Sequence, residues 1–233
     1  MKIYVSTCDK YDKLLTGFAY LFNKYWPGQD VTVLGFRQPA PLPANFTFHS
    51  MAQAETEPWS TYMNRVFTAI TEKRFVFLFD DYWLREPVNQ ERVAWMERVV
   101  THNAAKGDLS GNTHYFPHTT YKNNPELVVA SQNAPYRTST QPAIWRKEYM
   151  CRLMQPGWNP WQFELNAPAG NDGYTIVGPR TPIYIYANAY YKGSPDPYML
   201  AKLSDDDLIQ LEQIGALQDM PKLEGLKGLR SQA

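Results

Sequence analysis

The segment Phe75-Val-Phe-Leu-Phe79, followed at once by Asp80 and Asp81, decides the fold of this chain. Five consecutive apolar residues have the length of a strand, and a strand that is apolar on both faces is typical of the interior of a parallel sheet. Open α/β sheets bind ligands at the carboxyl ends of their strands. Because two carboxylates at that end are costly to bury without compensation, the segment predicts both a layered fold and a site.

The sequence on either side of this strand alternates between strand and helix patterns over the first hundred residues. Short β-rich runs stand at 3–5, 31–34 and 46–48. Apolar residues at helical spacing stand at 12–25, at 62–70 behind a Ser60 cap, and after Pro87. This alternation predicts an α/β fold with a mainly parallel, mixed central sheet.

The remaining sequence is less regular. It predicts a polar stretch at 108–140, a helix at 142–154, a Pro/Trp-rich loop at 155–164, strands at 174–177 and 183–186, and a helix capped by Ser204. We expect one domain over residues 1–220 and a loosely held tail over residues 221–233.

The composition excludes several classes of protein. The chain has 233 residues, its 23 basic and 23 acidic side chains cancel, and 15% of its residues are aromatic. This excludes a charge-rich disordered chain and a protein that holds nucleic acid through bulk charge. Cys8 and Cys151 lie far apart, and no segment has the apolar length of a signal peptide core or a membrane span. We expect a protein of a reducing compartment with no membrane span.

Asp80 and Asp81 are candidate ligands for Mg²⁺ or Mn²⁺, because these hard cations prefer oxygen donors and accompany phosphates. The alternative is a turn in which one Asp caps the following segment. Two other candidates for a metal site, His114 and His118, are four residues apart, but the intervening Pro117 favours a solvated loop.

Glu164 ends the segment Trp158-Asn-Pro-Trp161-Gln-Phe-Glu164. One carboxylate beside aromatic side chains fits a general base at a sugar-stacking platform. The alternative is a surface residue at the start of a helix, with the aromatic residues in the core. No GxSxG, GxxxxGK[ST] or GxGxxG motif is present, so serine-hydrolase, P-loop and Rossmann fingerprints lack support.

Six segments, in this order, resemble small GT-A-type glycosyltransferases, the nucleotide-sugar-dependent transferases of bacteria and phages. The segments are KIYVSTCDKYD, the helix that ends in KYWPG, TYMNRVFTAITEKRFVFLFDDYWL, STQPAIWRKEYM, NPWQFE and IYIYANAYYKG. The likeness extends from about residue 2 to about residue 195. Its strongest element is the apolar strand followed by Asp80-Asp81-Tyr82-Trp83.

The resemblance implies a single GT-A domain, an α/β/α sandwich that binds a nucleoside diphosphate sugar, with uridine as the expected base. It implies roles for four groups of residues. Ser6, Thr7 and Asp9 would face the base and ribose, Trp59 and Arg65 would flank the nucleotide, and Asp80 and Asp81 would hold the metal and the ribose or sugar. Gln141, Trp145 and Trp161 would contact the donor sugar or the acceptor.

The implied reaction is direct displacement of a hexosyl or pentosyl group with inversion. Glu164 would deprotonate an acceptor hydroxyl, and the metal at Asp81 would stabilise the departing diphosphate. The family motif is Asp-x-Asp, whereas the third position here is Tyr82. The metal, Mn²⁺ or Mg²⁺, would therefore depend on Asp81 and the diphosphate oxygens, or be held weakly, or be absent.

Two acceptors fit the resemblance: a surface glycan or lipopolysaccharide precursor, and hydroxymethylated pyrimidine in phage DNA. A basic strip for DNA would come from Arg137, Arg146, Lys147 and Arg152, three of them on the predicted helix. Either acceptor places the protein in the cytoplasm of a bacterial or phage-infected cell, and the sequence indicates no oligomeric state.

Two other interpretations remain open. One is a nucleotidyltransferase or other nucleotide-binding enzyme, although the loop STCDKYDK lacks the glycine that phosphate loops use. The other is a non-catalytic carbohydrate-binding module, which would not need carboxylates at the end of a buried strand.

Overall fold

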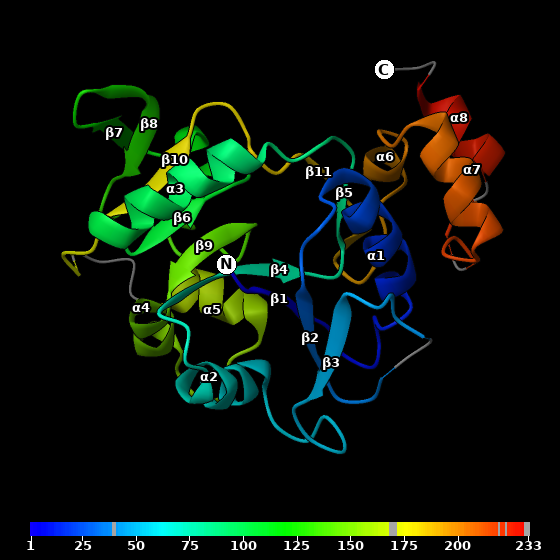
Figure 1. Ribbon diagram of the computed structural model, residues 1–233, viewed down its shortest axis with the longest axis horizontal. Helices are drawn as coiled ribbons and strands as arrows, with labels where there is room; N and C mark the ends of the chain where they lie inside the picture. The colour runs from blue at the N-terminus through cyan, green and yellow to red at the C-terminus, as the bar shows by residue number, and fades with distance from the viewer. Residues whose placement is uncertain (39–40, 168–171, 219, 222, 231–233) are drawn as a thin grey trace. The chain divides into compact units, whose positions relative to one another are not determined.

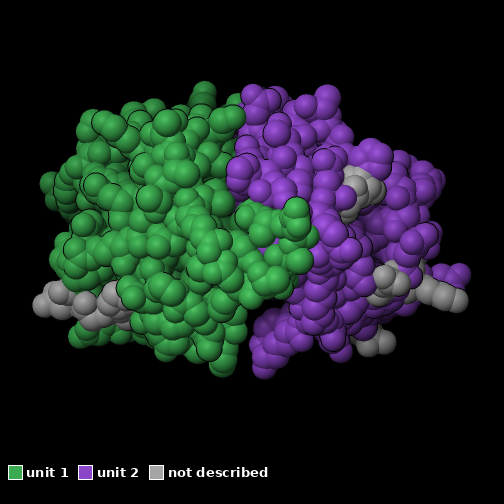
Figure 2. Space-filling view, turned by 90° about the horizontal axis from the view of Figure 1, so that it is seen from below, with its two compact units in different colours: residues 1–4, 51–78, 89–184 green, residues 5–50, 79–88, 185–233 purple. Residues whose placement is uncertain are grey.

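The computed structural model describes residues 1–38, 41–167, 172–218, 220–221 and 223–230 (Figure 1). The chain forms two compact units, coloured separately in Figure 2. Unit 1 comprises Met1–Tyr4, Met51–Leu78 and Asn89–Tyr184, and unit 2 comprises Val5–Ser50, Phe79–Val88 and Ile185–Ala233. Strands β1 (Ile3–Ser6) and β4 (Arg74–Phe79) contribute residues to both units.

Unit 1 contains most of the sheet, with the strand order β1-β4-β9-β6-β10-β8-β7. Strand β9 (Ala143–Arg146) is antiparallel to both β4 and β6 (Lys106–Asp108), and β6 is parallel to β10 (Ile176–Pro179). The antiparallel strands β8 (Asn124–Ala130) and β7 (His118–Tyr121) continue the order. The result is a mixed sheet.

Helices cover the sheet of unit 1. Helix α3 (Gln90–His102) packs against β6 and β9 (Figure 1). It lies close to the strand at Gly107, where a Cβ atom would come within 2.8 Å of Val100 and Met96. Helices α2 (Trp59–Ala69), α4 (Lys147–Leu153) and α5 (Pro160–Asn166) form a second packed group, in which α2 contacts both others.

Unit 2 holds the strand order β3-β2-β1, in which β2 (Val31–Gly35) and β3 (Phe46–Ser50) are parallel. Helix α1 (Leu14–Tyr25) packs on β5 (Tyr82–Leu84), which pairs with β11 (Tyr186–Asn188). Gly17 permits this contact, because a Cβ atom there would lie 2.4 Å from the ring of Trp83. The remaining elements of the two units are η1 (Asn112–Tyr115), the hairpin β12 (Tyr190–Tyr191) and β13 (Ser194–Pro195), α6 (Pro197–Leu200), α7 (Asp205–Gln213) and α8 (Leu223–Arg230).

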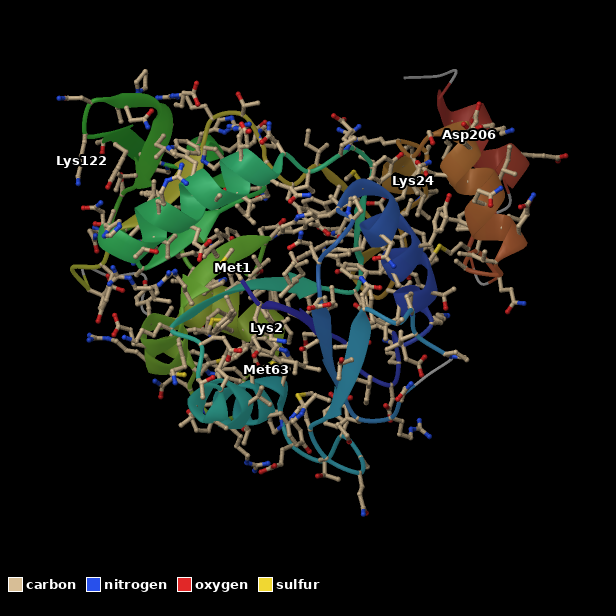
Figure 3. The ribbon with its side chains drawn as sticks, viewed as in Figure 1. Met1, Lys2, Lys24, Met63, Lys122 and Asp206 are labelled. Atoms are coloured by element: carbon tan, nitrogen blue, oxygen red, sulfur yellow. The ribbon has the colours of Figure 1, made fainter. Side chains whose placement is uncertain are left out.

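A buried carboxylate joins α7 to α1 within unit 2. Asp207 accepts hydrogen bonds from Lys24 Nζ at 2.6 Å, Tyr25 Oη at 2.7 Å and Ser204 Oγ at 2.6 Å. Figure 3 labels Lys24 on α1 and Asp206, the neighbour of Asp207, on α7. Ser204 also accepts from the Asp207 backbone N–H, so it caps α7 as predicted.

The predicted α/β fold around a mixed sheet is confirmed, and so are the strands and helices expected in the first hundred residues. Ser60 is not a cap, however. Helix α2 begins at Trp59, and Ser60 Oγ donates to Gln155 O at 2.6 Å. Strands β7 and β8 occupy part of the polar stretch expected at 108–140, and β11 begins at Tyr186, where the predicted strand ends.

Two predictions in the middle of the chain are wrong. The helix expected at 142–154 is strand β9 followed by α4, because residues 143–146 fill the space between β4 and β6 and pair with both. The loop expected at 155–164 becomes helix α5 at Pro160. There Asn159 and Gln162 form a reciprocal capping box, and proline suits the first helical position because no N–H is needed there.

The predicted tail contains α8, in which Leu226 is buried. Its loose attachment stays a prediction, as does the domain boundary at residue 220, and residues 222 and 231–233 lie outside the described chain. Within the described ranges no helix has the length and apolar character to cross a membrane.

Candidate active site

In unit 2, the carboxyl end of β4 places Asp80 beside the loop that follows β1. Asp80 is 4% exposed, and its Oδ2 accepts a hydrogen bond from Thr7 Oγ1 at 2.6 Å. Its backbone N–H donates to Ser6 O, and its carbonyl accepts from Trp83 Nε1 at 3.1 Å. The next residue, Asp81, is fixed through its backbone carbonyl, which accepts from the N–H of Ala189.

The electrostatics at Asp80 favour a cation. Burial first, and then the charge of Asp81, raise the pKa of Asp80 well above its usual range, while the Thr7 hydroxyl acts in the opposite direction. A divalent cation compensates this kind of poorly solvated negative charge. The carboxylate oxygens of Asp80 and Asp81 are donors of the kind that Mg²⁺ and Mn²⁺ prefer, and their role as metal ligands stays a prediction. In the described chain, the surroundings of Asp80 included, no three His, Cys, Asp or Glu side chains gather in a metal-binding arrangement.

The structure brings Ser6 and Thr7 into contact with Asp80 in unit 2, and Asp9 follows two residues after Thr7. Ser6 and Thr7 are buried, and Thr7 N donates to Leu34 O, which fixes the loop on β2. Asp9 is half-buried and accepts from Arg37 Nε at 2.9 Å. Arg37 was not predicted, because it stands 28 residues from Asp9 in sequence and no motif marks it.

In unit 1, α5 presents Glu164 to the segment that precedes β9. Glu164 is half-buried, and its Oε1 accepts two hydrogen bonds from Thr140, from N at 2.5 Å and from Oγ1 at 2.6 Å. No donor in the described chain contacts the other oxygen, Oε2. One fixed carboxylate oxygen and one open oxygen form a suitable arrangement for a general base.

A buried lysine lies next to this arrangement. Lys106 on β6 is 1% exposed, and its Nζ donates to Ser139 O at 2.6 Å and lies 4.9 Å from the centre of the Trp145 ring. Burial lowers the pKa of Lys106 to about 8; the charges of Asp108 and Glu164 oppose this shift, and that of Arg137 adds to it. Neither Lys106 nor Thr140 carried a signal in the sequence.

The remaining predicted residues of unit 1 differ in exposure. Trp161, three residues before Glu164 on α5, is 63% exposed, whereas Trp145 is fully buried against Tyr149 and Phe163. Trp145 is therefore corrected from a sugar contact to a core residue. Trp59 is largely buried against Phe77 and Phe163, Arg65 is exposed and pairs with Glu57, and Gln141 is half-buried next to Thr140.

Of the four residues expected in a basic strip for DNA, Arg152 is exposed and the other three bind groups of unit 1. Arg137 is buried and donates to Asp172 at 3.0 Å and to Tyr149 Oη at 3.1 Å. Arg146 donates to two carbonyls at the end of α3, and Lys147 donates to Ile70 O at 2.8 Å. These cations bind groups of unit 1 itself, which the sequence spacing could not reveal.

No protein-family model matches the chain, and no curated protein matches it in sequence. Its structure is similar to the mannosyltransferase PcManGT from Pyrobaculum calidifontis in complex with GDP-Man and Mn²⁺, with a TM-score of 0.50 and 11% identity over 98% of this chain. It also matches S. aureus TarS 1-349, with a TM-score of 0.49 and 11% identity over 98% of the chain. A galactosyltransferase, LgtC, in complex with donor and acceptor sugar analogues, matches 47% of the chain, with a TM-score of 0.34 and 13% identity.

The chain spans 67% of PcManGT, 68% of TarS 1-349 and 46% of LgtC. At such low identity, a likeness in structure shows a common fold and leaves the reaction open. The fold rests on the match to PcManGT, because the other two TM-scores lie below 0.5. The chain therefore has a GT-A-like α/β fold, the fold of a glycosyltransferase that was solved with a nucleotide sugar.

Proposed function

We propose that this protein is a glycosyltransferase that moves a sugar from a nucleoside diphosphate sugar, expected to be UDP-linked, to an acceptor hydroxyl. The observation that carries the proposal is a pair of carboxylate centres on a GT-A-like fold. Asp80 and Asp81 end the buried strand β4, and Glu164 on α5 has one oxygen fixed by Thr140 and one open.

Unit 2 would bind the donor. Ser6, Thr7 and Asp9 line the loop after β1 and would face the base and ribose, and the hydrogen bond from Thr7 fixes the carboxylate of Asp80. Asp81 and Asp80 would hold Mn²⁺ or Mg²⁺, which supplies positive charge to the diphosphate as it leaves. Because Tyr82 replaces the second acid of Asp-x-Asp, the donor phosphates would supply more of the ligands.

Glu164 would supply the base, and Trp161 would supply part of the acceptor platform. Glu164 Oε2 would take the proton of the acceptor hydroxyl, whose oxygen attacks the anomeric carbon. The bond from that carbon to the diphosphate oxygen breaks, and the electron pair leaves with the nucleoside diphosphate, so the configuration inverts. The exposed ring of Trp161, one turn before Glu164, offers a flat apolar face on which a sugar ring can stack.

A glycan is the favoured acceptor, such as a surface polysaccharide or lipopolysaccharide precursor. The exposed aromatic side chain beside Glu164 supports it. Arg137, Arg146 and Lys147 bind groups of unit 1, so only Arg152 of the predicted basic strip is exposed. Hydroxymethylated DNA remains a testable second acceptor, since its binding would fall steeply with salt.

The first experiment compares Glu164→Gln with the matched control Glu148→Gln, an exposed glutamate on α4 of the same unit. The amide that replaces the carboxylate in Glu164→Gln still offers a carbonyl oxygen to Thr140, so the fold should be kept. We expect transfer to fall by about 10²–10⁴-fold with nucleotide affinity unchanged, the range for loss of a general base. Normal turnover in Glu164→Gln would remove Glu164 from this role.

The second experiment incubates the protein with a panel of UDP, GDP, CDP and TDP sugars, with Mn²⁺ or Mg²⁺ and glycan acceptors. Release of nucleoside diphosphate together with a glycosylated product supports the proposal. Release of pyrophosphate from a nucleoside triphosphate and sugar phosphate would indicate a nucleotidyltransferase. Sugar binding without turnover or nucleotide affinity would indicate a carbohydrate-binding module.

A further inference from the structure

We infer that Lys106 is a positioning residue for Glu164, an inference that rests on the proposed function. Lys106 Nζ donates to Ser139 O at 2.6 Å and to Ser139 Oγ at 3.3 Å. The next residue, Thr140, donates from its backbone N–H and from its hydroxyl to Glu164 Oε1. A short chain of contacts thus connects Lys106 on β6 to the carboxylate of Glu164 on α5. Lys106 fixes the backbone at Ser139, and the next residue, Thr140, holds Glu164.

No carboxylate of the described chain pairs directly with Lys106. Its neighbour on the same face of β6, Asp108, is already satisfied by the N–H and hydroxyl groups of Ser110 and Thr113. Lys106 forms no ion pair within 4.0 Å in the described chain. A buried ammonium whose hydrogen bonds in the described chain go to Ser139 and not to a carboxylate is costly for stability, since a neutral residue would avoid the desolvation of a charge.

The charges around Lys106 couple it to Glu164. Asp108 faces it from β6, Glu164 from α5 and Arg137 from the segment before β9. The ring of Trp145 on β9 also packs against the ammonium. Glu164 raises the pKa of Lys106, which burial holds at about 8. The carboxylate of Glu164 therefore stabilises the charged form of Lys106. The lysine is thus charged at neutral pH and neutral above pH 8, so the support of Ser139 and Thr140 weakens with alkali.

The first test does not depend on activity. The side chains of ¹³C-labelled lysines are titrated by NMR in the wild type, in Glu164→Gln and in the control Glu148→Gln, with Lys106 assigned through Lys106→Met. We expect a midpoint near 8 in the wild type and in the control, and a lower midpoint in Glu164→Gln because the supporting carboxylate is gone. An unchanged midpoint in Glu164→Gln would overturn the inference.

The second test separates positioning from a purely structural role. Lys147→Met is the matched control, because Lys147 also donates to a carbonyl of unit 1, Ile70 O, without contact to Glu164. We expect Lys106→Met to lower kcat at least tenfold with the donor KM unchanged within twofold, and Lys147→Met to change neither. Thermal unfolding of both variants checks that the fold is kept.

A pH profile completes the design. In the wild type, kcat should fall above about pH 8, and in Lys106→Arg, which keeps its charge, that alkaline fall should move to higher pH. Equal kcat in Lys106→Met and Lys147→Met would refute the positioning role. If no donor sugar is transferred even by the wild type, the proposed function fails, while the NMR titration still decides whether Lys106 and Glu164 are coupled.

Discussion

The buried charge of Lys106 predicts an unusual dependence of stability on pH. Its pKa falls from the ordinary 10.5 to about 8 in the folded protein, chiefly through burial. At about 1.4 kcal/mol per pKa unit, this corresponds to roughly 3 kcal/mol against the folded state whenever the lysine is protonated in both states. Replacing it by Met, which has a similar length and no charge, removes that cost.

The direction in which the free energy of unfolding changes with pH follows from proton binding at Lys106. Between pH 8 and 10.5 the unfolded chain binds a proton at Lys106 and the folded chain does not, so the free energy of unfolding rises with pH across this range. The useful window ends near pH 10, because Tyr4, with its pKa raised to about 12, begins to favour the unfolded state there. Within the window, we expect the wild type to gain about 2–3 kcal/mol relative to Lys106→Met.

The assay is urea unfolding, followed by tryptophan fluorescence, at pH 7, 8, 9 and 10 for the wild type, Lys106→Met and the exposed control Lys202→Met. Taking the difference between variants cancels the titrations that they share. Lys202→Met should follow the wild-type profile. Parallel profiles for the wild type and Lys106→Met would refute the assignment of a costly buried ammonium at this position.

Three further substitutions test the contacts of unit 2. Asp207→Ala should lower the free energy of unfolding by about 3–5 kcal/mol, because the groups that donate to the buried carboxylate lose their partner. Burial tends to raise the pKa of Asp207, but its three donors more than offset this and hold the pKa below its usual value. The stability advantage of the wild type, measured by urea unfolding, should therefore fade as the solution is acidified through that pKa. Thr7→Val removes the hydrogen bond to Asp80 and should weaken Mn²⁺-dependent nucleotide binding about tenfold by calorimetry, at roughly 1.4 kcal/mol for a charged hydrogen bond; equal affinity would argue against a donor site at this loop. Gly17→Ala should cost about 1–3 kcal/mol, since the added methyl group overlaps the Trp83 ring, and an unchanged thermal midpoint would show that the ring can move aside.

The predictable parts of the fold are the strands and helices whose own residues show a distinctive local pattern. Five apolar residues before Asp80 could form little other than a buried strand, and Ser204 with three aspartates behind it marked α7. Strand β9 was not predictable, because its apolar residues suit a helix equally well and only the neighbouring strands decide between the two. The capping pattern of Asn159, Pro160 and Gln162 is present in the sequence, but the Pro/Trp-rich composition around it is typical of a loop.

The residues of the candidate site also fall into those that the sequence indicates and those that only the structure shows. Asp80 and Glu164 stand out because a carboxylate next to apolar or aromatic residues needs an explanation. Thr140 and Lys106 act through space on Glu164, 24 and 58 positions away along the chain, and their neighbours in sequence give no hint of it. A sequence can indicate which group does chemistry more readily than which groups hold it, because the holding contacts depend on tertiary packing.

The close approach of Gly17 to Trp83 has a consequence for how this chain can diverge. The indole fills the space of any side chain at position 17, and its Nε1 also supports the Asp80 carbonyl. A larger residue at position 17 therefore requires a smaller one at position 83, and that exchange removes a support of the acidic pair. Among homologous sequences, these two positions should change together or not at all, and a lineage that exchanges them should also show altered acids at positions 80 and 81.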